Sequence, residues 1–310
     1  MRVINQLNKA IDSKVFKSHL LHGVTGSGKT EIFIEIIKRV IGQGKSAIVL
    51  LPEISLTPQI AGRFKSVFGN LTTLWHSQLT KSQRASTWIK INNGDYKIVI
   101  GARSAIFSPL KNLGLIIVDE EHDSSYKQDS PSPRYHARDV AIMRAKIEKS
   151  NIVLSSATPS LESYYNYKIN KYNYLSLPKR YGKANYPKVK IIDLIKESEE
   201  SGKGNIVISG TLLDKIENKL SKNEQILLIQ NRRGHSPTVR CSDCGEMAMC
   251  LACKTPLTYH KYDNKLKCHI CGYVEKESFD NCKECLSTKL IFMGTGTQKV
   301  AVSYTHLRAH

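Results

Sequence analysis

The sequence "SHLLHGVTGSGKTEIFIEIIKRV" (residues 18–40) joins a short apolar run to a glycine-rich turn and a helical segment. Its centre fits the pattern GxxxxGK[ST]. Such a pattern is informative where it follows a strand and opens a helix, since glycines let backbone N–H groups approach phosphate oxygens. Lys29 would neutralise β- and γ-phosphate charge, and Thr30 would ligate Mg²⁺. The predicted nucleotide-binding residues are Gly23, Thr25, Gly26, Ser27, Gly28, Lys29, Thr30 and Glu31.

Short runs rich in Ile and Val follow along the chain. They are "SAIVLLP" (46–52), "YKIVIGA" (96–102), "LGLIIVDE" (113–120) and "SNIVLSSAT" (150–158). Runs that are apolar on both faces suit buried parallel strands. Helical segments such as 57–68 and 138–148 alternate with them. The pattern therefore predicts an α/β domain over residues 1–175.

An acidic pair follows one of these runs, in "LIIVDEEHD" (115–123). Asp119 can hold the Mg²⁺ shell, and Glu120 can polarise an attacking water as general base. Acidic residues at strand ends are often only solvated caps, but a phosphate loop upstream favours the catalytic interpretation. "SSATPS" (155–160) ends the next run, where ligands sit in open α/β sheets. We predict ATP and Mg²⁺ as cofactors and Lys29, Asp119 and Glu120 as catalytic residues.

The eight cysteines all lie within residues 241–285, as four CxxC pairs. Four thiolates make a closed tetrahedral site typical of structural zinc, and a reducing compartment favours metal over disulfides. "TPLTYHKYDNKLK" (255–267) has the pattern of a hairpin, which would bring its two flanking pairs together. His260 and His269 are alternative ligands. We predict two zinc ions, an inner one at Cys250, Cys253, Cys268 and Cys271 and an outer one at Cys241, Cys244, Cys282 and Cys285.

The chain of 310 residues is strongly basic, with 46 Lys and Arg against 27 Asp and Glu and a net charge of +19. Such a charge attracts polyanions, with nucleic acid the leading candidate. The alternative is a Lys-rich composition that reflects AT-rich codons. There is no apolar run of about 18 residues and no signal-peptide core in residues 1–20. We expect a cytoplasmic protein with no membrane partner.

These motifs together resemble a known family. "GVTGSGKTE", "DEEH" and "SATPS" resemble motifs I, II and III of superfamily 2 helicases. The strings "LPEISLTPQ", "GARSAIFSP", "DEEHDSSYKQ", "LIQNRRGHSP" and "GTGTQKV" are similar to the PriA family of primosomal replication-restart helicases (primosomal protein N′). The CxxC pairs between "NRRG" and "GTGT" also match that family's zinc-binding insertion. The resemblance spans residues 20–300.

The resemblance implies an ATP-dependent 3′→5′ DNA helicase, hence an ATP hydrolase, that binds stalled forks and D-loops and promotes primosome assembly. Its implied partners are DNA, other primosome proteins, single-stranded DNA-binding protein and the replicative helicase, in the bacterial cytoplasm at the nucleoid. The implied fold is two P-loop NTPase (RecA-like) lobes with mainly parallel sheets. The expected domains are a first lobe (1–175), a linker with the start of the second lobe (176–240), a zinc-binding insertion (241–285) and an incomplete remainder of the second lobe (286–310).

The resemblance also implies DNA contacts. "PEISLTPQ" (52–59) and "GARSAIF" (101–107) would hold the DNA backbone, and "SSYKQDSPSPRYHARD" (124–139) resembles the aromatic-rich loop that couples DNA binding to hydrolysis. Aromatic rings can stack on bases while cations track the backbone. The alternative for residues 124–139 is an ordinary solvated basic loop. The alternative for Arg232 and Arg233 is contact with the nucleotide instead of DNA. The expected DNA-binding residues are Arg103, Ser104, Tyr126, Lys127, Arg134, Arg232 and Arg233.

The chain departs from the family pattern at both ends. It starts almost at motif I, where the family has an N-terminal DNA-binding domain, and the tail "SYTHLRAH" (303–310) resembles translated adaptor sequence. Motif VI, whose arginine finger contributes about 10³–10⁵ in rate, is absent. We therefore expect a fragment with little activity. Competing hypotheses are a superfamily 2 translocase that moves on duplex DNA without unwinding it, and a non-motor zinc module, against which the intact "GSGKT" and "DEEH" argue.

Overall fold

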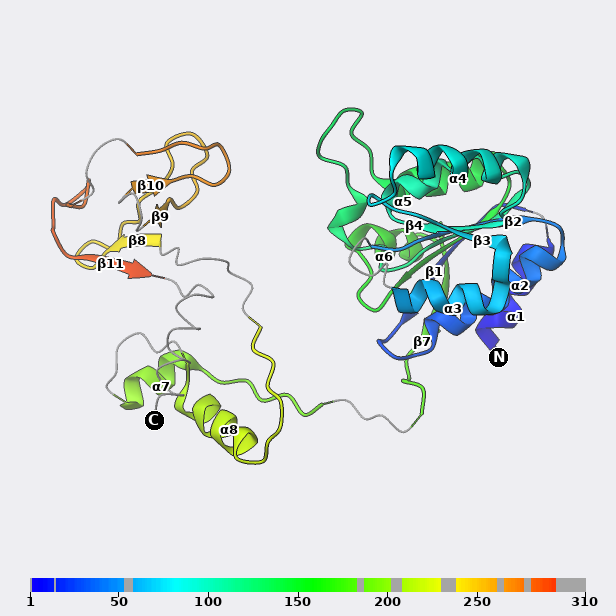
Figure 1. Ribbon diagram of the computed structural model, residues 1–310. Coiled ribbons are helices and arrows are strands. Elements are labelled where there is room, and N and C mark those ends of the chain that lie inside the picture. The colour runs from blue at the N-terminus through cyan, green and yellow to red at the C-terminus, as the bar shows by residue number, and fades with distance from the viewer. Residues whose placement is uncertain are drawn as a thin grey trace. The chain divides into compact units, whose positions relative to one another are not determined.

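The computed structural model describes residues 2–13, 15–52, 58–182, 187–201, 208–229, 238–260, 265–275 and 280–293. The chain divides into two compact units, Met1–Pro187 and Lys188–His310 (Figure 1). None of the helices in these ranges combines the length and apolar character that crossing a membrane requires.

The first unit is built on a seven-stranded sheet in which all neighbouring strands run parallel, in the order β3-β4-β2-β5-β6-β1-β7. The central strands are buried along their whole length, as their apolar sequences predict. The strands are β1 (Lys17–Gly23), β2 (Ser46–Leu50), β3 (Thr72–Trp75), β4 (Ile98–Gly101), β5 (Leu113–Val118), β6 (Asn151–Ser156) and β7 (Asn173–Leu177).

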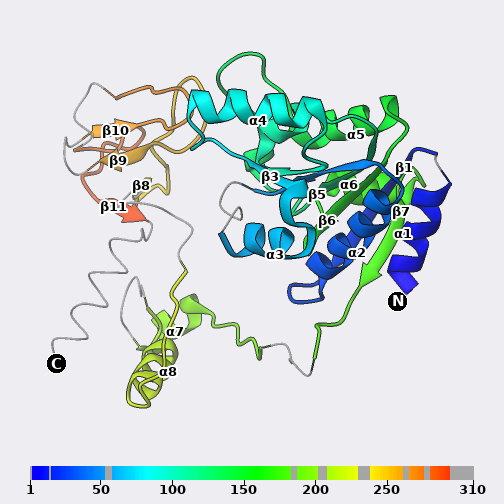
Figure 2. The same ribbon diagram turned by 45° about the vertical axis from the view of Figure 1, so that its right-hand side comes forward.

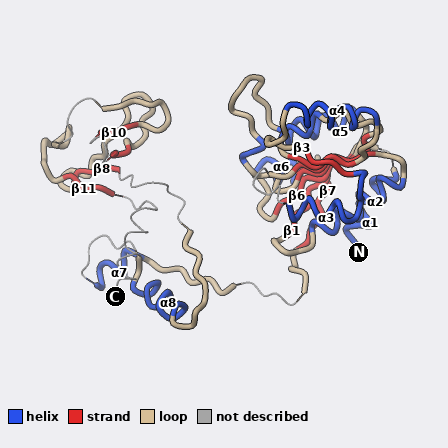
Figure 3. Tube along the Cα trace, in the orientation of Figure 1, coloured by secondary structure: helices blue, strands red, loops and turns tan. Residues whose placement is uncertain are grey.

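Helices cover both faces of this sheet, which forms a single layer between them (Figure 2, Figure 3). Alternate residues of each strand enter two separate cores. One core includes α1 (Arg2–Asp12), α2 (Lys29–Gly42) and α3 (Pro58–Phe68). The other includes α4 (Lys81–Asn93), α5 (Ala137–Ile147) and the short turn η3 (Arg103–Phe107). The remaining elements of this unit are α6 (Leu161–Lys168), η2 (Gly69–Leu71) and η4 (Ser124–Tyr126).

The second unit contains two helices and a small antiparallel sheet. The helices are α7 (Leu194–Ser201) and α8 (Gly210–Leu220). The sheet has the order β10-β9-β8-β11, with β8 (Thr238–Cys241), β9 (Thr258–His260), β10 (Lys265–Lys267) and β11 (Leu290–Met293). Strands β9 and β10 form the hairpin that the sequence predicts. The core of this region is small and contains Val239, Leu257, Leu266, Cys250 and Cys268.

Three segments differ from expectation. Residues 176 and 177, expected at the start of the linker, belong instead to β7, an edge strand that pairs with β1. The apolar run "EQILLIQNRRG" (224–234) predicts a strand of the second lobe, but its described part, 224–229, forms none, and Leu227 is 83% exposed there. In the last apolar run, β11 pairs with β8 of the cysteine region.

Candidate functional site

The carboxyl ends of β5, β6 and β1 are neighbours in the sheet, so the loops that follow them meet. After β1, Gly26 and Gly28 have φ of +77° and +87°, which glycine adopts without strain. A Cβ on Gly23 would lie 2.8 Å from Ser27 Oγ, so a larger residue there would displace the Ser27 side chain. Helix α2 begins at Lys29 with no side-chain cap, which leaves its first N–H groups for an anion.

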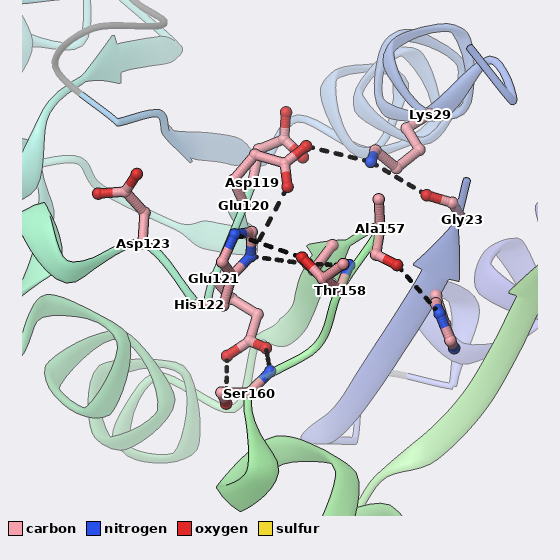
Figure 4. A network of polar contacts seen from close by, with 12 residues as sticks. Gly23, Lys29, Asp119, Glu120, Glu121, His122, Asp123, Ala157, Thr158 and Ser160 are labelled. Atoms are coloured by element: carbon pink, nitrogen blue, oxygen red, sulfur yellow. Dashed lines mark hydrogen bonds and ion pairs between the residues drawn. The ribbon is translucent and has the colours of Figure 1, made fainter. Parts of the chain in front are cut away.

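Lys29 joins this loop to the acidic pair after β5 (Figure 4). Its Nζ donates to the carbonyl of Gly23 at 3.1 Å and to Glu120 Oε1 at 3.2 Å. Glu120 has φ of +45°, a left-handed conformation that costs a non-glycine residue about 1–3 kcal/mol and occurs most often at functional sites. The structure therefore brings together the lysine and the carboxylate that the two motifs predict.

Asp119 carries an oxygen suited to a divalent cation. Burial, and then repulsion from the Glu120 charge, raises the pKa of its carboxyl. Its Oδ1 atom is buried and has no hydrogen-bond partner among the described residues, and the same is true of Ser27 Oγ. Unpartnered buried oxygens are costly, and a bound Mg²⁺–nucleotide complex would relieve that cost. The residues present therefore fit a magnesium–nucleotide site.

His122 connects the acidic pair to the loop after β6. Its Nδ1 lies 2.8 Å from Ser156 Oγ and 3.7 Å from Glu120 Oε2, and its Nε2 lies 3.5 Å from Thr158 Oγ1. The backbone N–H of Thr158 donates to Ser156 Oγ at 2.8 Å. "DEEH" and "SSAT" thus form one hydrogen-bonded network, as expected from adjacent strands.

Glu121 is a member of the network that the sequence did not reveal. It is 0% exposed and accepts hydrogen bonds from the backbone N–H and Oγ of Ser160, from Ser163 Oγ and from Arg138 Nη1. These contacts, at 2.7–3.1 Å, tie the loop after β5 to the starts of α5 and α6. The sequence did contain a signal, because Glu121 is the third consecutive carboxylate after a buried strand. Its hydrogen-bond partners, however, lie too far along the chain to be identified from the sequence.

Glu31, predicted to contact nucleotide, is exposed in the first turn of α2 and forms an ion pair with Arg63 of α3. Thr25 and Thr30 lie in the loop and at the start of α2, as expected.

The residues expected to bind DNA fall into three groups. Arg103 and Ser104 lie after β4 and line a polar cavity. Lys127 and Arg134 are exposed, and Lys127 Nζ lies 3.7 Å from Asp129. Arg232 and Arg233 lie outside the described residues, as do Ser55 and Thr57.

Tyr126 requires a correction. Its side chain is 0% exposed and belongs to the core beneath α5, and its hydroxyl donates to the backbone carbonyl of Asp119 at 2.6 Å. A ring in that position has no face on which a base can stack. The composition of residues 124–139 suggested that the Tyr126 ring contacts DNA, but in the structure this ring packs in the core that includes β5.

The eight thiols form two groups, and these are the nested sets that the hairpin predicts. The inner group is Cys250, Cys253, Cys268 and Cys271, the outer group is Cys241, Cys244, Cys282 and Cys285, and within each the sulfurs lie within 4.8 Å of one another. Four sulfurs 2.3 Å from one zinc lie about 3.8 Å apart. The observed Sγ–Sγ distances include 3.5 Å for Cys241 and Cys285 and 3.6 Å for Cys250 and Cys271.

The thiols within each group shift one another's pKa values in opposite directions. Backbone N–H groups, first that of Cys271, lower the pKa of Cys268 to about 6, whereas hydrogen bonding to neighbouring thiols, first that of Cys271, raises the pKa of Cys253 to about 12. All eight cysteines are free of disulfides. His260 and His269 contact each other, with their Nε2 atoms 3.2 Å apart, and join neither group. The geometry fits two structural zinc ions.

Comparison with known proteins identifies the class of protein to which this chain belongs. A sequence model described as DEAD/DEAH box helicase matches residues 3–166, and one described as the PriA DNA helicase Cys-rich region domain matches residues 250–276. The chain belongs to the DEAD/DEAH box helicase family. The fold agrees with this assignment, because the parallel sheet carries the phosphate loop and a zinc-binding region follows it.

Within that family the chain is similar to replication restart protein PriA. It is 46% identical to the Bacillus subtilis protein over 299 residues, which are 96% of this chain and 37% of that protein. It is 44% identical to the Chlamydia pneumoniae protein (96% and 40%) and 44% identical to the Haemophilus influenzae protein (95% and 40%). The chain thus spans about two fifths of the length of these relatives. The resemblance predicted from the motifs is confirmed.

Proposed function

We propose that this chain carries the ATP-binding lobe and the zinc module of a DNA helicase that acts in replication restart. The single observation that supports this most directly is the contact of Lys29 with Glu120 beside buried Asp119, in a chain 46% identical to a PriA protein. Lys29 binds the β- and γ-phosphates, Thr30 and Asp119 hold Mg²⁺, and Glu120 polarises the attacking water.

The contact between Lys29 and Glu120 has a chemical consequence. When a triphosphate enters the loop, its oxygens compete for the lysine ammonium, and Glu120 is released to accept a proton from water. His122, held by Ser156, limits where the released carboxylate can move. Each of these groups acts by position and charge, which is how phosphoryl transfer is catalysed in this class of enzyme.

The wider role follows from the relatives. We propose 3′→5′ movement on DNA, binding at forks and D-loops, and contacts with primosome proteins, single-stranded DNA-binding protein and the replicative helicase in the bacterial cytoplasm. The first lobe would include β7 and extend to Pro187 rather than end at residue 175. A linker and the start of the second lobe would follow up to residue 240, then the zinc insertion (241–285) and a further part of the second lobe (286–310). The net charge of +19 supports a polyanionic partner.

The test uses the protein expressed from its complete reading frame, forked DNA with a 3′ or a 5′ single-stranded arm, and ATP. Strand separation should require the 3′ arm, and Lys29→Ala or Glu120→Gln should lower DNA-stimulated hydrolysis by about 100-fold or more. Lys38→Ala is the matched control, because Lys38 lies on the same helix but pairs with exposed Glu35. ATP turnover without strand separation would favour a duplex translocase, and turnover that ignores DNA would contradict the proposal.

A further inference from the structure

His260 and His269 contact each other in the cysteine region and lie outside both thiol groups. Their Nε2 atoms are 3.2 Å apart, and their ring centroids are 5.1 Å apart with the ring planes inclined by 47°. Two imidazole nitrogens bound at about 2.0–2.1 Å to one tetrahedral zinc ion lie about 3.3 Å apart. The two rings are therefore spaced as a shared metal ion requires.

The backbone that carries each ring is held by the fold around the inner cysteine group. His260 ends β9, which pairs with β10 across the hairpin. His269 lies in the turn between Cys268 and Cys271, where the N–H of Gly272 donates to the carbonyl of Cys268 at 3.0 Å. Both histidines thus project from backbone that is already ordered, so little backbone entropy is lost when a metal binds.

A direct hydrogen bond between the two rings is the competing explanation for the contact. In such a pair, one Nε2–H donates to the lone pair of the other Nε2, and 3.2 Å is at the long end of the range for such a bond. The two explanations differ in an observable way, because a pair of rings that is only hydrogen-bonded takes up no metal.

The ligand set defines the kind of ion that the pair would bind. Imidazole nitrogens suit zinc, copper and nickel, and zinc is the ion that the neighbouring thiol groups fit. Among the described residues, no third His, Cys or carboxylate ligand atom lies with the two rings. A tetrahedral zinc ion would therefore keep two positions for water, and the pair is exposed to solvent. Such an ion exchanges more readily than one enclosed by four thiolates.

We propose that His260 and His269 bind a third zinc ion, at an exchangeable site whose formation depends on the inner cysteine group. The ion would join β9 to the turn that follows β10. Because it would bind only the folded hairpin, it would stabilise that hairpin in proportion to its occupancy. Both histidines belong to the second unit and take no part in the proposed nucleotide site, so the two proposals succeed or fail independently.

The first experiment counts the ions. The protein from the complete reading frame is equilibrated at a series of buffered free Zn²⁺ concentrations, and its zinc content is measured by atomic emission. At the higher concentrations the unmodified protein should bind one zinc ion more than His260→Ala, His269→Ala or the double variant. All three variants should lose the same single ion, because one ion needs both rings. The matched control is His76→Ala, which removes a partly exposed histidine from the first unit and should leave the count unchanged.

Equal zinc counts in the unmodified protein and the double variant would overturn the site, because any extra zinc would then be an adventitious ion only. Loss of the ion from one single variant but not from the other would also overturn it, because the two rings would not share an ion. Retention of the thiolate-bound ions shows that the histidine variants are folded.

X-ray absorption at the zinc edge of the unmodified protein gives an answer even where a variant loses the inner ion as well. The additional ion should contribute nitrogen neighbours at about 2.0–2.1 Å, beside the sulfur neighbours at about 2.3 Å that the thiol groups supply. An additional ion surrounded by sulfur alone would contradict the proposal.

The second experiment tests the connection to the hairpin. Free Zn²⁺ at about 100 times the dissociation constant of the third site should slow amide exchange that requires the hairpin to open by about 100-fold. Residues 258–260 and 265–267 report this effect, which should be absent in the double variant. Cys285→Ser should keep the third ion, whereas Cys268→Ser should lose it together with the inner one. Unchanged exchange in the unmodified protein, or a third ion retained by Cys268→Ser, would show that the site is not part of the hairpin.

Discussion

Single side chains at the proposed nucleotide site act through contacts that reach beyond their own loops. Glu121 is the strongest case, because a fully buried carboxylate is tolerated only when it is paired and hydrogen-bonded. It meets that condition with Arg138, whose side chain is 12% exposed, and with the hydroxyls of Ser160 and Ser163. The position of the neighbouring Glu120 therefore depends on how α5 and α6 are packed.

Replacing Glu121 should destabilise the first unit. In Glu121→Gln the Arg138 guanidinium loses its buried counter-charge, and breaking such a pair costs about 3–5 kcal/mol. Urea denaturation followed by tryptophan fluorescence measures this, since both tryptophans, Trp75 and Trp88, lie in that unit. Glu148→Gln, which removes a pair with Arg144 at the surface, should cost less than about 1 kcal/mol. Equal costs for the two variants would contradict the role of Glu121.

His19 predicts a pH dependence of stability. The side chain is 3% exposed in β1, and burial lowers its pKa from 6.5 to about 4. Between these values the unfolded chain binds a proton that the folded chain does not, so the free energy of unfolding is highest above pH 6.5 and falls as the pH drops towards 4. The fall is about 3 kcal/mol. The urea midpoint of unfolding, measured by tryptophan fluorescence across this pH range, should depend less on pH in a folded His19→Gln variant than in the unmodified protein. The same pH dependence in both proteins would exclude His19 as the cause.

At the scale of elements, the cysteine region depends on its metal more than on its core. Strands β8, β9, β10 and β11 have only three or four residues each, and two of the buried core residues are the ligands Cys250 and Cys268. A core of this size supplies too little apolar burial to fold unaided, so zinc binding must stabilise the fold.

The two zinc sites should respond differently to mutation. Cys268→Ser should abolish the inner site and with it the β9–β10 hairpin, because Cys268 directly follows β10 and packs in the core. Cys285→Ser should remove one zinc and leave the hairpin intact, because Cys285 is exposed and belongs to the outer group. Zinc content and amide-exchange protection of residues 258–260 and 265–267 measure both effects. Loss of hairpin protection in both variants would show that the sites fold as one.

Strands in the interior of the large sheet were predictable, whereas those at its edges were not. β2, β4, β5 and β6 are apolar on both faces because both faces are covered. β3 and β7 are the two edge strands and are only partly buried, so their sequences resemble those of loops. The hairpin between Cys253 and Cys268 was predictable because residues that favour strands lie on both sides of residues that favour a turn.

On the scale of the whole molecule, the two units have separate cores and different means of stabilisation. The first unit has an apolar core on each face of its sheet, and both cysteine groups lie in the second unit. A strong chelator should therefore remove zinc and unfold the cysteine region while the urea midpoint reported by Trp75 and Trp88 stays unchanged. A shifted midpoint after chelation would mean that the two units are energetically coupled.

The glycine-rich loop, the acidic pair, the buried strands and the nested cysteine sets were predictable from the sequence, because each depends on local spacing or on a short apolar run. The roles of Glu121 and Tyr126, in contrast, became visible in the folded protein. Their partners, Ser160 with Arg138 for one and the Asp119 carbonyl for the other, are fixed by how loops pack around the strand ends. Burial of a side chain is a property of everything packed against it, and neither residue type nor spacing along the chain specifies those neighbours.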